Sequence, residues 1–133
     1  CVITAENKAY EVKGIGSTVG INLVGDDLKG AYVIHNHPDT DDFLGDCFSR
    51  DDFKCFFKYG IKEMQVSSGL GRYSMQYEGE YFTGEDAAML YDKAHKKMYE
   101  KAFQSNDYVE YEQLETMKVL SDMLEDLVFK RLG

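Results

Sequence analysis

The sequence predicts an α+β domain: a mixed β-sheet with flanking helices, followed by a helical hairpin from about Thr83. Before Thr83, apolar and polar residues alternate in short segments such as residues 72–77, which is the period of a half-buried strand. After Thr83, apolar residues recur every three or four positions, which is the period of an amphipathic helix. The 133 residues, of which 44% are hydrophobic, suit one domain with a single core.

The N-terminal part of the chain predicts three strands separated by turns. Residues 1–4 and 9–13 are rich in strand-forming side chains and are joined by a polar turn, which predicts a β-hairpin. Glycines recur in residues 14–20 and are expected to lie in turns, because no convincing helix follows them. A loop or a single helical turn at residues 26–30 then leads into a third strand, residues 31–34.

A short helix and two further strands are expected next. Ser49 suits the N-cap of this helix, and Asp52 suits its first turn. The apolar face of the helix is formed by three aromatic residues: Phe53, Phe56 and Phe57. Residues 61–67 and 72–77 then alternate in the manner of strands.

Two helices are predicted after residue 83. The first begins at Thr83, has acidic residues in its first turn and continues to about Phe103. The second begins at about Val109 and continues to Val128. Its apolar stripe consists of Leu114, Met117, Leu120, Leu124, Leu127 and Val128. These stripes can pack on each other or on the sheet. Because the spacing is helical after Thr83, no strand is expected after residue 90.

The strongest functional signal is a pair of histidines just after the strand at residues 31–34. His35 and His37 are two positions apart, so on an extended backbone both imidazoles point to the same side. Pro38 fixes the backbone immediately after them. Asp52, at the start of the predicted helix, adds a carboxylate. Two histidines and one aspartate form a three-ligand set for zinc, and an open fourth position for water would make the site catalytic.

This arrangement resembles the JAMM metallopeptidase motif of the JAB/MPN fold, which is cytidine-deaminase-like. The matching residues are His35-x-His37-Pro38, a spacer and Ser49-x-x-Asp52, and the order H-N-H-P is especially similar to RadC-like and phage-associated bacterial members. The resemblance implies that His35, His37 and Asp52 bind Zn²⁺ and that Ser49 stabilises the oxyanion. Residues 1–83 would then form the metal-binding domain, with residues 84–133 as a C-terminal helical extension packed on the same domain.

The resemblance also implies a reaction: hydrolysis of a peptide or isopeptide amide by a metal-activated water. The processing of phage proteins is one candidate role for this reaction. The family uses a glutamate as general base, placed just before or within its first strand. Glu6 and Glu11 are the nearby alternatives. Because the chain starts at Cys1 without Met, we expect a fragment or processed chain, in which case this glutamate can lie upstream. The rival interpretation is a catalytically silent MPN-like scaffold that binds protein partners.

Composition excludes several other classes of function. The formal net charge of −9 argues against nucleic-acid binding, because phosphate contacts need a basic patch. No apolar run approaches the ~20 residues of a membrane span, and no signal peptide is visible. Three cysteines without a CxxC pair favour free thiols in a reducing compartment. We therefore expect a cytoplasmic protein whose partner is a protein or peptide substrate.

Two features near the predicted site each allow two interpretations. The acidic spacer at residues 39–46, which contains Phe43 and Leu44, is either a flap over the metal or a solvated loop. Cys47 is either a further metal ligand or a thiol of the loop or core, and we expect the second.

Overall fold

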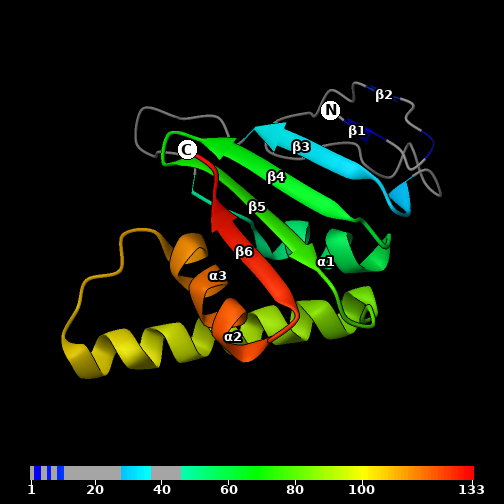
Figure 1. The fold of residues 1–133 in the computed structure, drawn as a ribbon. Coiled ribbons are helices and arrows are strands. Elements are labelled where there is room, and N and C mark those ends of the chain that lie inside the picture. Colours follow the sequence, from blue (N-terminus) through cyan, green and yellow to red (C-terminus); the bar gives the residue numbers. More distant parts are fainter. Residues whose placement is uncertain (1, 4–5, 7–8, 11–27, 37–45) are drawn as a thin grey trace.

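A computed structural model describes residues 2–3, 6, 9–10, 28–36 and 46–133. Within these residues the chain is α+β, as predicted, with a mixed six-stranded sheet and three helices (Figure 1). The strands lie in the order β2 (Ala9–Tyr10), β1 (Val2–Ile3), β3 (Tyr32–Asn36), β4 (Glu63–Ser68), β5 (Gly71–Tyr77) and β6 (Leu127–Arg131). The antiparallel pairing of β1 with β2 confirms the predicted N-terminal hairpin.

The pairing of β3 with β4 sets the position of the candidate site. This pair is parallel, whereas the other neighbouring strands pair antiparallel. Parallel strands need a crossover connection, and here it contains the helix α1 (Arg50–Lys58). Because α1 runs back along the sheet, the amino end of α1 lies near the carboxyl end of β3.

The three helices lie on one side of the sheet (Figure 1). α2 (Gly84–Ser105) packs against α1, and α3 (Glu112–Met123) packs against α2 and β6. Aromatic rings join the layers: the ring centroid of Phe53 in α1 lies 5.9 Å from that of Tyr91 in α2, and Phe57 lies 5.0 Å from Tyr77 of β5. None of these helices, in the part of the chain described, is long and apolar enough to cross a membrane.

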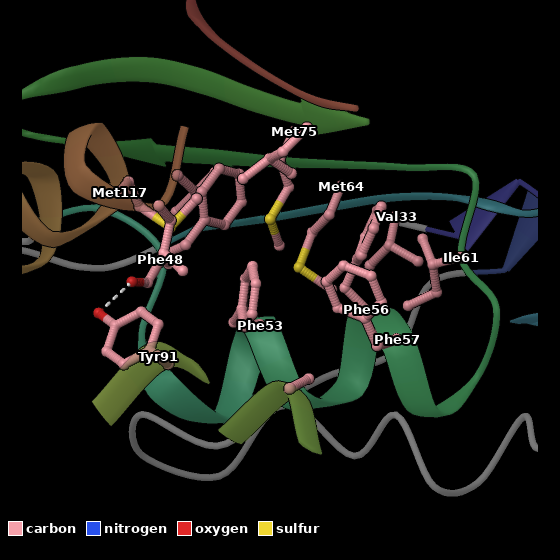
Figure 2. Close-up of a cluster of buried hydrophobic side chains, with 14 of the residues drawn as sticks. Val33, Phe48, Phe53, Phe56, Phe57, Ile61, Met64, Met75, Tyr91 and Met117 are labelled. Atoms are coloured by element: carbon pink, nitrogen blue, oxygen red, sulfur yellow. Dashed lines mark hydrogen bonds between the residues drawn. The ribbon is translucent and has the colours of Figure 1, made fainter. Parts of the chain in front are cut away.

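The core lies between the sheet and the helices, and α1 contributes its aromatic face to it (Figure 2). Phe53, Phe56 and Phe57 are buried on one face of α1, as the sequence predicts. They point toward Met64 of β4 and Met75 of β5, which are both 0% exposed. Full burial of a side chain of this size contributes roughly 1.5–3 kcal/mol. The aromatic face therefore fixes the rotation of α1 about its axis, and with it the direction of the side chains in its first turn.

Glycine ends α1 with a Schellman motif. Gly60 N–H donates to the carbonyl of Phe57 at 3.3 Å, and Ile61 N–H donates to the carbonyl of Phe56 at 3.0 Å. Gly60 has φ +65°, a conformation that costs glycine little because it has no Cβ. The chain thus turns directly from α1 into β4.

The C-terminal prediction is correct for two helices and wrong for the segment that follows them. α2 begins after its N-cap Thr83, as predicted, and ends at Ser105, followed by the C-cap Asn106 in a left-handed conformation. α3 ends at Met123, and residues 127–131 form β6, which pairs antiparallel with β5. The expectation of helix up to Val128, without a strand after residue 90, is therefore wrong. Leu124, Leu127 and Val128 fit the spacing of a helical stripe. In the structure, however, the backbone N–H and C=O groups of residues 127–131 pair with the edge of β5.

Candidate metal site

His35 lies near the carboxyl end of β3 and points into the protein. Burial alternates along the strand, so Val33 and His35 are buried while Asn36 is exposed. The His35 residue is only 8% exposed, and its ring centroid lies 6.5 Å from that of Phe48. Val33 and His35, which are two positions apart, therefore point to the same side of β3. His37, the second predicted ligand, lies outside the described residues.

Ser49 and Asp52 form a capping box at the start of α1. Ser49 Oγ accepts a hydrogen bond from the Asp52 N–H at 3.1 Å, and Asp52 Oδ2 accepts one from the Ser49 N–H at 2.9 Å. The N-cap position predicted for Ser49 is thus confirmed. These reciprocal bonds hold the Asp52 carboxylate in one orientation, which directs its other oxygen toward β3.

That other oxygen contacts His35. The distance from His35 Nε2 to Asp52 Oδ1 is 3.2 Å, and the two side chains are 5% and 14% exposed. Zinc bonds of about 2.0–2.2 Å at a tetrahedral angle separate two ligand atoms by roughly 3.3 Å. The donor types and their spacing therefore fit a zinc ion. The distance also fits a direct hydrogen bond, which would hold the pair together before a metal binds.

The structure thus brings together three of the four residues predicted for the site: His35, Ser49 and Asp52. Within the described residues, no group of three or more His, Cys, Asp or Glu side chains has the arrangement of a metal site. The predicted ligand set reaches three only with His37, which is outside those residues. The described part of the site is therefore a ligand pair held between a strand end and a helix start.

Only some of the other residues predicted near the site lie within the described part of the chain. Glu6, one alternative for the general base, lies in the turn between β1 and β2 and is exposed. Glu11, the other alternative, lies outside the described residues, as do Phe43 and Leu44 of the proposed flap.

Asp46 has a role that the sequence analysis missed. It belongs to the acidic spacer, for which a flap or a solvated loop is expected, yet Asp46 is only 4% exposed. Its carboxylate accepts hydrogen bonds from the backbone N–H groups of Gln113 and Leu114, at the start of α3. Neither expected interpretation describes Asp46. The one available signal was the absence of a Ser, Thr, Asp or Asn at the N-cap of α3, where Tyr111 makes no side-chain cap bond.

Cys47 is a buried thiol, as expected. It is 0% exposed, and burial raises its pKa to about 12. Cys47 belongs to the cluster of buried hydrophobic residues, which agrees with the expected thiol of the loop or core.

We expect Cys47 to resist alkylation in the folded protein. Its thiol is inaccessible and, at about pH 8, protonated, so it lacks both properties that make a cysteine reactive. Iodoacetamide labelling followed by peptide mass spectrometry should modify Cys47 only after a denaturant is added. Cys55, which is partly exposed, is the internal control and should be labelled first. Equal labelling rates of Cys47 in native and denatured protein would contradict its burial.

Comparison with known proteins found no relative of this chain. No family model matches the chain, and neither a curated protein nor a solved structure matches it.

Proposed function

We propose that this chain is a zinc-dependent peptidase or isopeptidase of the JAMM type, built on a JAB/MPN-like fold. The observation that carries the proposal is the 3.2 Å contact between His35 Nε2 and Asp52 Oδ1. The two residues stand at the ligand positions of the motif that the sequence resembles, and His37 is the proposed third ligand. A bound zinc ion would supply the Lewis acid that activates water and polarises the amide carbonyl.

The proposed role of Ser49 is to support the reaction without acting as nucleophile. Its Oγ accepts from the Asp52 N–H, which leaves its own hydroxyl proton to donate. Such a donor can stabilise the negative charge that develops on the carbonyl oxygen. His35 is a poor candidate for activating Ser49, because its Nε2 faces the Asp52 carboxylate.

The proposed substrate is a peptide or isopeptide amide of a protein, and the processing of phage proteins is the candidate role. The proposed general base is a glutamate, with Glu6, Glu11 and a residue preceding Cys1 as the alternatives. Substitution of Glu6 and Glu11 by glutamine, one at a time, separates these alternatives by its effect on hydrolysis.

Metal analysis and a chelator test this proposal. We expect about one zinc ion per chain, and hydrolysis that stops when a chelator removes the metal and returns when zinc is added. Ser49→Ala should lower kcat by about 10²–10³-fold without abolishing activity, because it removes an oxyanion donor and not the nucleophile. Ser105→Ala, at an exposed serine of α2, is the matched control. Chelator-resistant hydrolysis, or labelling of Ser49 by a serine-hydrolase probe, would contradict the proposal.

A protein-binding scaffold is the second candidate function. Phe103, near the end of α2, and Tyr108, between α2 and α3, are 87% and 89% exposed. Large apolar side chains in this setting suit a protein partner. Stoichiometric zinc binding without hydrolysis of any peptide or isopeptide substrate would favour this scaffold over the enzyme.

A further inference from the structure

The segment that precedes α1 is tied to the start of α3. The Asp46 carboxylate accepts from the Gln113 N–H at 2.7 Å and from the Leu114 N–H at 3.1 Å. In return, the Gln113 side-chain Oε1 accepts from the Cys47 N–H at 3.2 Å. These bonds form a reciprocal cap between segments that are 66–68 positions apart in the sequence. They supply the acceptor that α3 lacks at its own N-cap, Tyr111.

The same segment is held by two further elements. The Asp46 carbonyl accepts from the Ser68 hydroxyl, at the end of β4, at 2.7 Å. The Phe48 carbonyl accepts from the Tyr91 hydroxyl of α2 at 2.9 Å (Figure 2). Burial raises the pKa of Tyr91, so this hydroxyl stays protonated and keeps donating. Residues 46–48 are thus fixed to β4, α2 and α3 immediately before Ser49.

We propose that Asp46 is a positioning residue of the candidate metal site and that it acts through the backbone that leads to Ser49 and Asp52. This inference rests on the proposed zinc site. Metal ligands must be held within about 0.5 Å of their productive geometry, which their supporting residues provide. The His35 ligand belongs to β3, whereas Asp52 belongs to α1, so their separation depends on how α1 is anchored. Asp46 supplies that anchor at the amino end of α1.

The cap that Asp46 provides differs from an ordinary surface cap because Asp46 is buried, although its hydrogen bonds are only partly so. Removing the carboxylate leaves two backbone N–H groups of α3 without their acceptor in a site where Asp46 is 4% exposed. We expect the segment to shift as water or another group replaces the lost acceptor. Such a shift is transmitted to Ser49 within three residues, and therefore to the capping box that orients Asp52.

The experiment compares Asp46→Ala with Thr83→Ala. Both substitutions remove a side-chain acceptor from a helix N-terminus, but Thr83 caps α2 by accepting from the Asp86 N–H and lies outside the candidate site. Zinc affinity, measured by competition with a chromophoric chelator, should fall about 10–100-fold in Asp46→Ala, the usual loss for a supporting residue of a metal site. It should be unchanged in Thr83→Ala. Asp46→Asn keeps one acceptor oxygen but places an NH2 donor where the second oxygen accepts, so its zinc affinity should lie between those of the wild type and Asp46→Ala.

A second measurement on the metal-free protein does not depend on the proposed function. Amide hydrogen exchange at Ser49 and Asp52 should accelerate in Asp46→Ala and stay unchanged in Thr83→Ala. If Asp46→Ala does not fold, Gln113→Ala replaces it, because this substitution removes only the acceptor of the Cys47 N–H. Unchanged exchange at both amides would overturn the positioning role.

The outcomes separate the two proposals. A wild-type protein that binds no zinc, but whose Ser49 and Asp52 amides lose protection in Asp46→Ala, would reject the proposed function and retain the anchoring role. A wild-type protein that binds zinc, with equal affinity in Asp46→Ala, would retain the function and reject the positioning role.

Discussion

Replacing His35 by alanine is expected to lower zinc affinity by more than the roughly 100-fold that the loss of a supporting residue costs. The reason is that His35 would be a direct ligand, and its Nε2 lies 3.2 Å from the Asp52 carboxylate. Asp52→Asn should have a similar effect, because an amide oxygen is a poorer zinc ligand than a carboxylate but can still accept from the Ser49 N–H. Titration calorimetry with zinc, together with metal analysis of the purified variants, measures both effects.

His95→Ala is the matched control for this experiment. His95 also lies beside a carboxylate, with Nε2 3.4 Å from Glu112 Oε2, but it belongs to α2 and is partly exposed. Its replacement should leave zinc affinity unchanged. His37→Ala should abolish zinc binding, while circular dichroism remains that of the folded chain. Full zinc occupancy in either the His35 or the His37 variant would remove the basis for the site.

Phe53→Ala is expected to have the largest effect on stability: it should lower the free energy of unfolding by about 3–5 kcal/mol. Phe53 is 0% exposed, lies between α2 and the sheet, and has its ring centroid 4.9 Å from Phe57 and 5.9 Å from Tyr91. Its loss removes buried apolar surface and leaves a cavity, which the packed neighbours can fill only in part. Urea denaturation followed by circular dichroism gives the change as a shift in the midpoint.

Phe103→Ala serves as the control for that measurement. The residue type and the substitution are the same, but Phe103 is 87% exposed near the end of α2, so its loss should change stability by less than about 0.5 kcal/mol. A stability change in Phe53→Ala no greater than in Phe103→Ala would refute the proposed packing of α1. Because Asp52 is adjacent to Phe53 in α1, zinc affinity should also be measured in this variant below its unfolding transition.

Features that depend on neighbouring residues could be predicted from the sequence. The capping box of Ser49 and Asp52 and the aromatic face of α1 are local patterns, and both are present in the structure. The contact between His35 and Asp52 could also be predicted, because one residue lies at a strand end and the other at a helix start. The proposed chemistry of the site stays a prediction.

Features that depend on distant partners could not be predicted in this way. Leu127 and Val128 suit a helix or a strand, and only the free edge of β5 decides between them. Asp46 belongs to an acidic run that looks solvated, and its burial depends on Gln113 and Leu114 at the start of α3. In both cases the deciding interaction joins segments that are about 50 or more positions apart, beyond the reach of any local period.

The pairing of β6 with β5 has a consequence for synthesis of the chain. β5 ends at Tyr77, but its outer partner begins only at Leu127, after α2 and α3. While the ribosome makes the intervening helices, one edge of the nascent sheet has unpaired N–H and C=O groups that another chain could bind. Closing this long loop also delays completion of the sheet, since contacts between distant segments form slowly. The edge of β5 therefore stays unpaired until residues 127–131 cover it, and a chain that stalls before Leu127 would be an aggregation-prone intermediate.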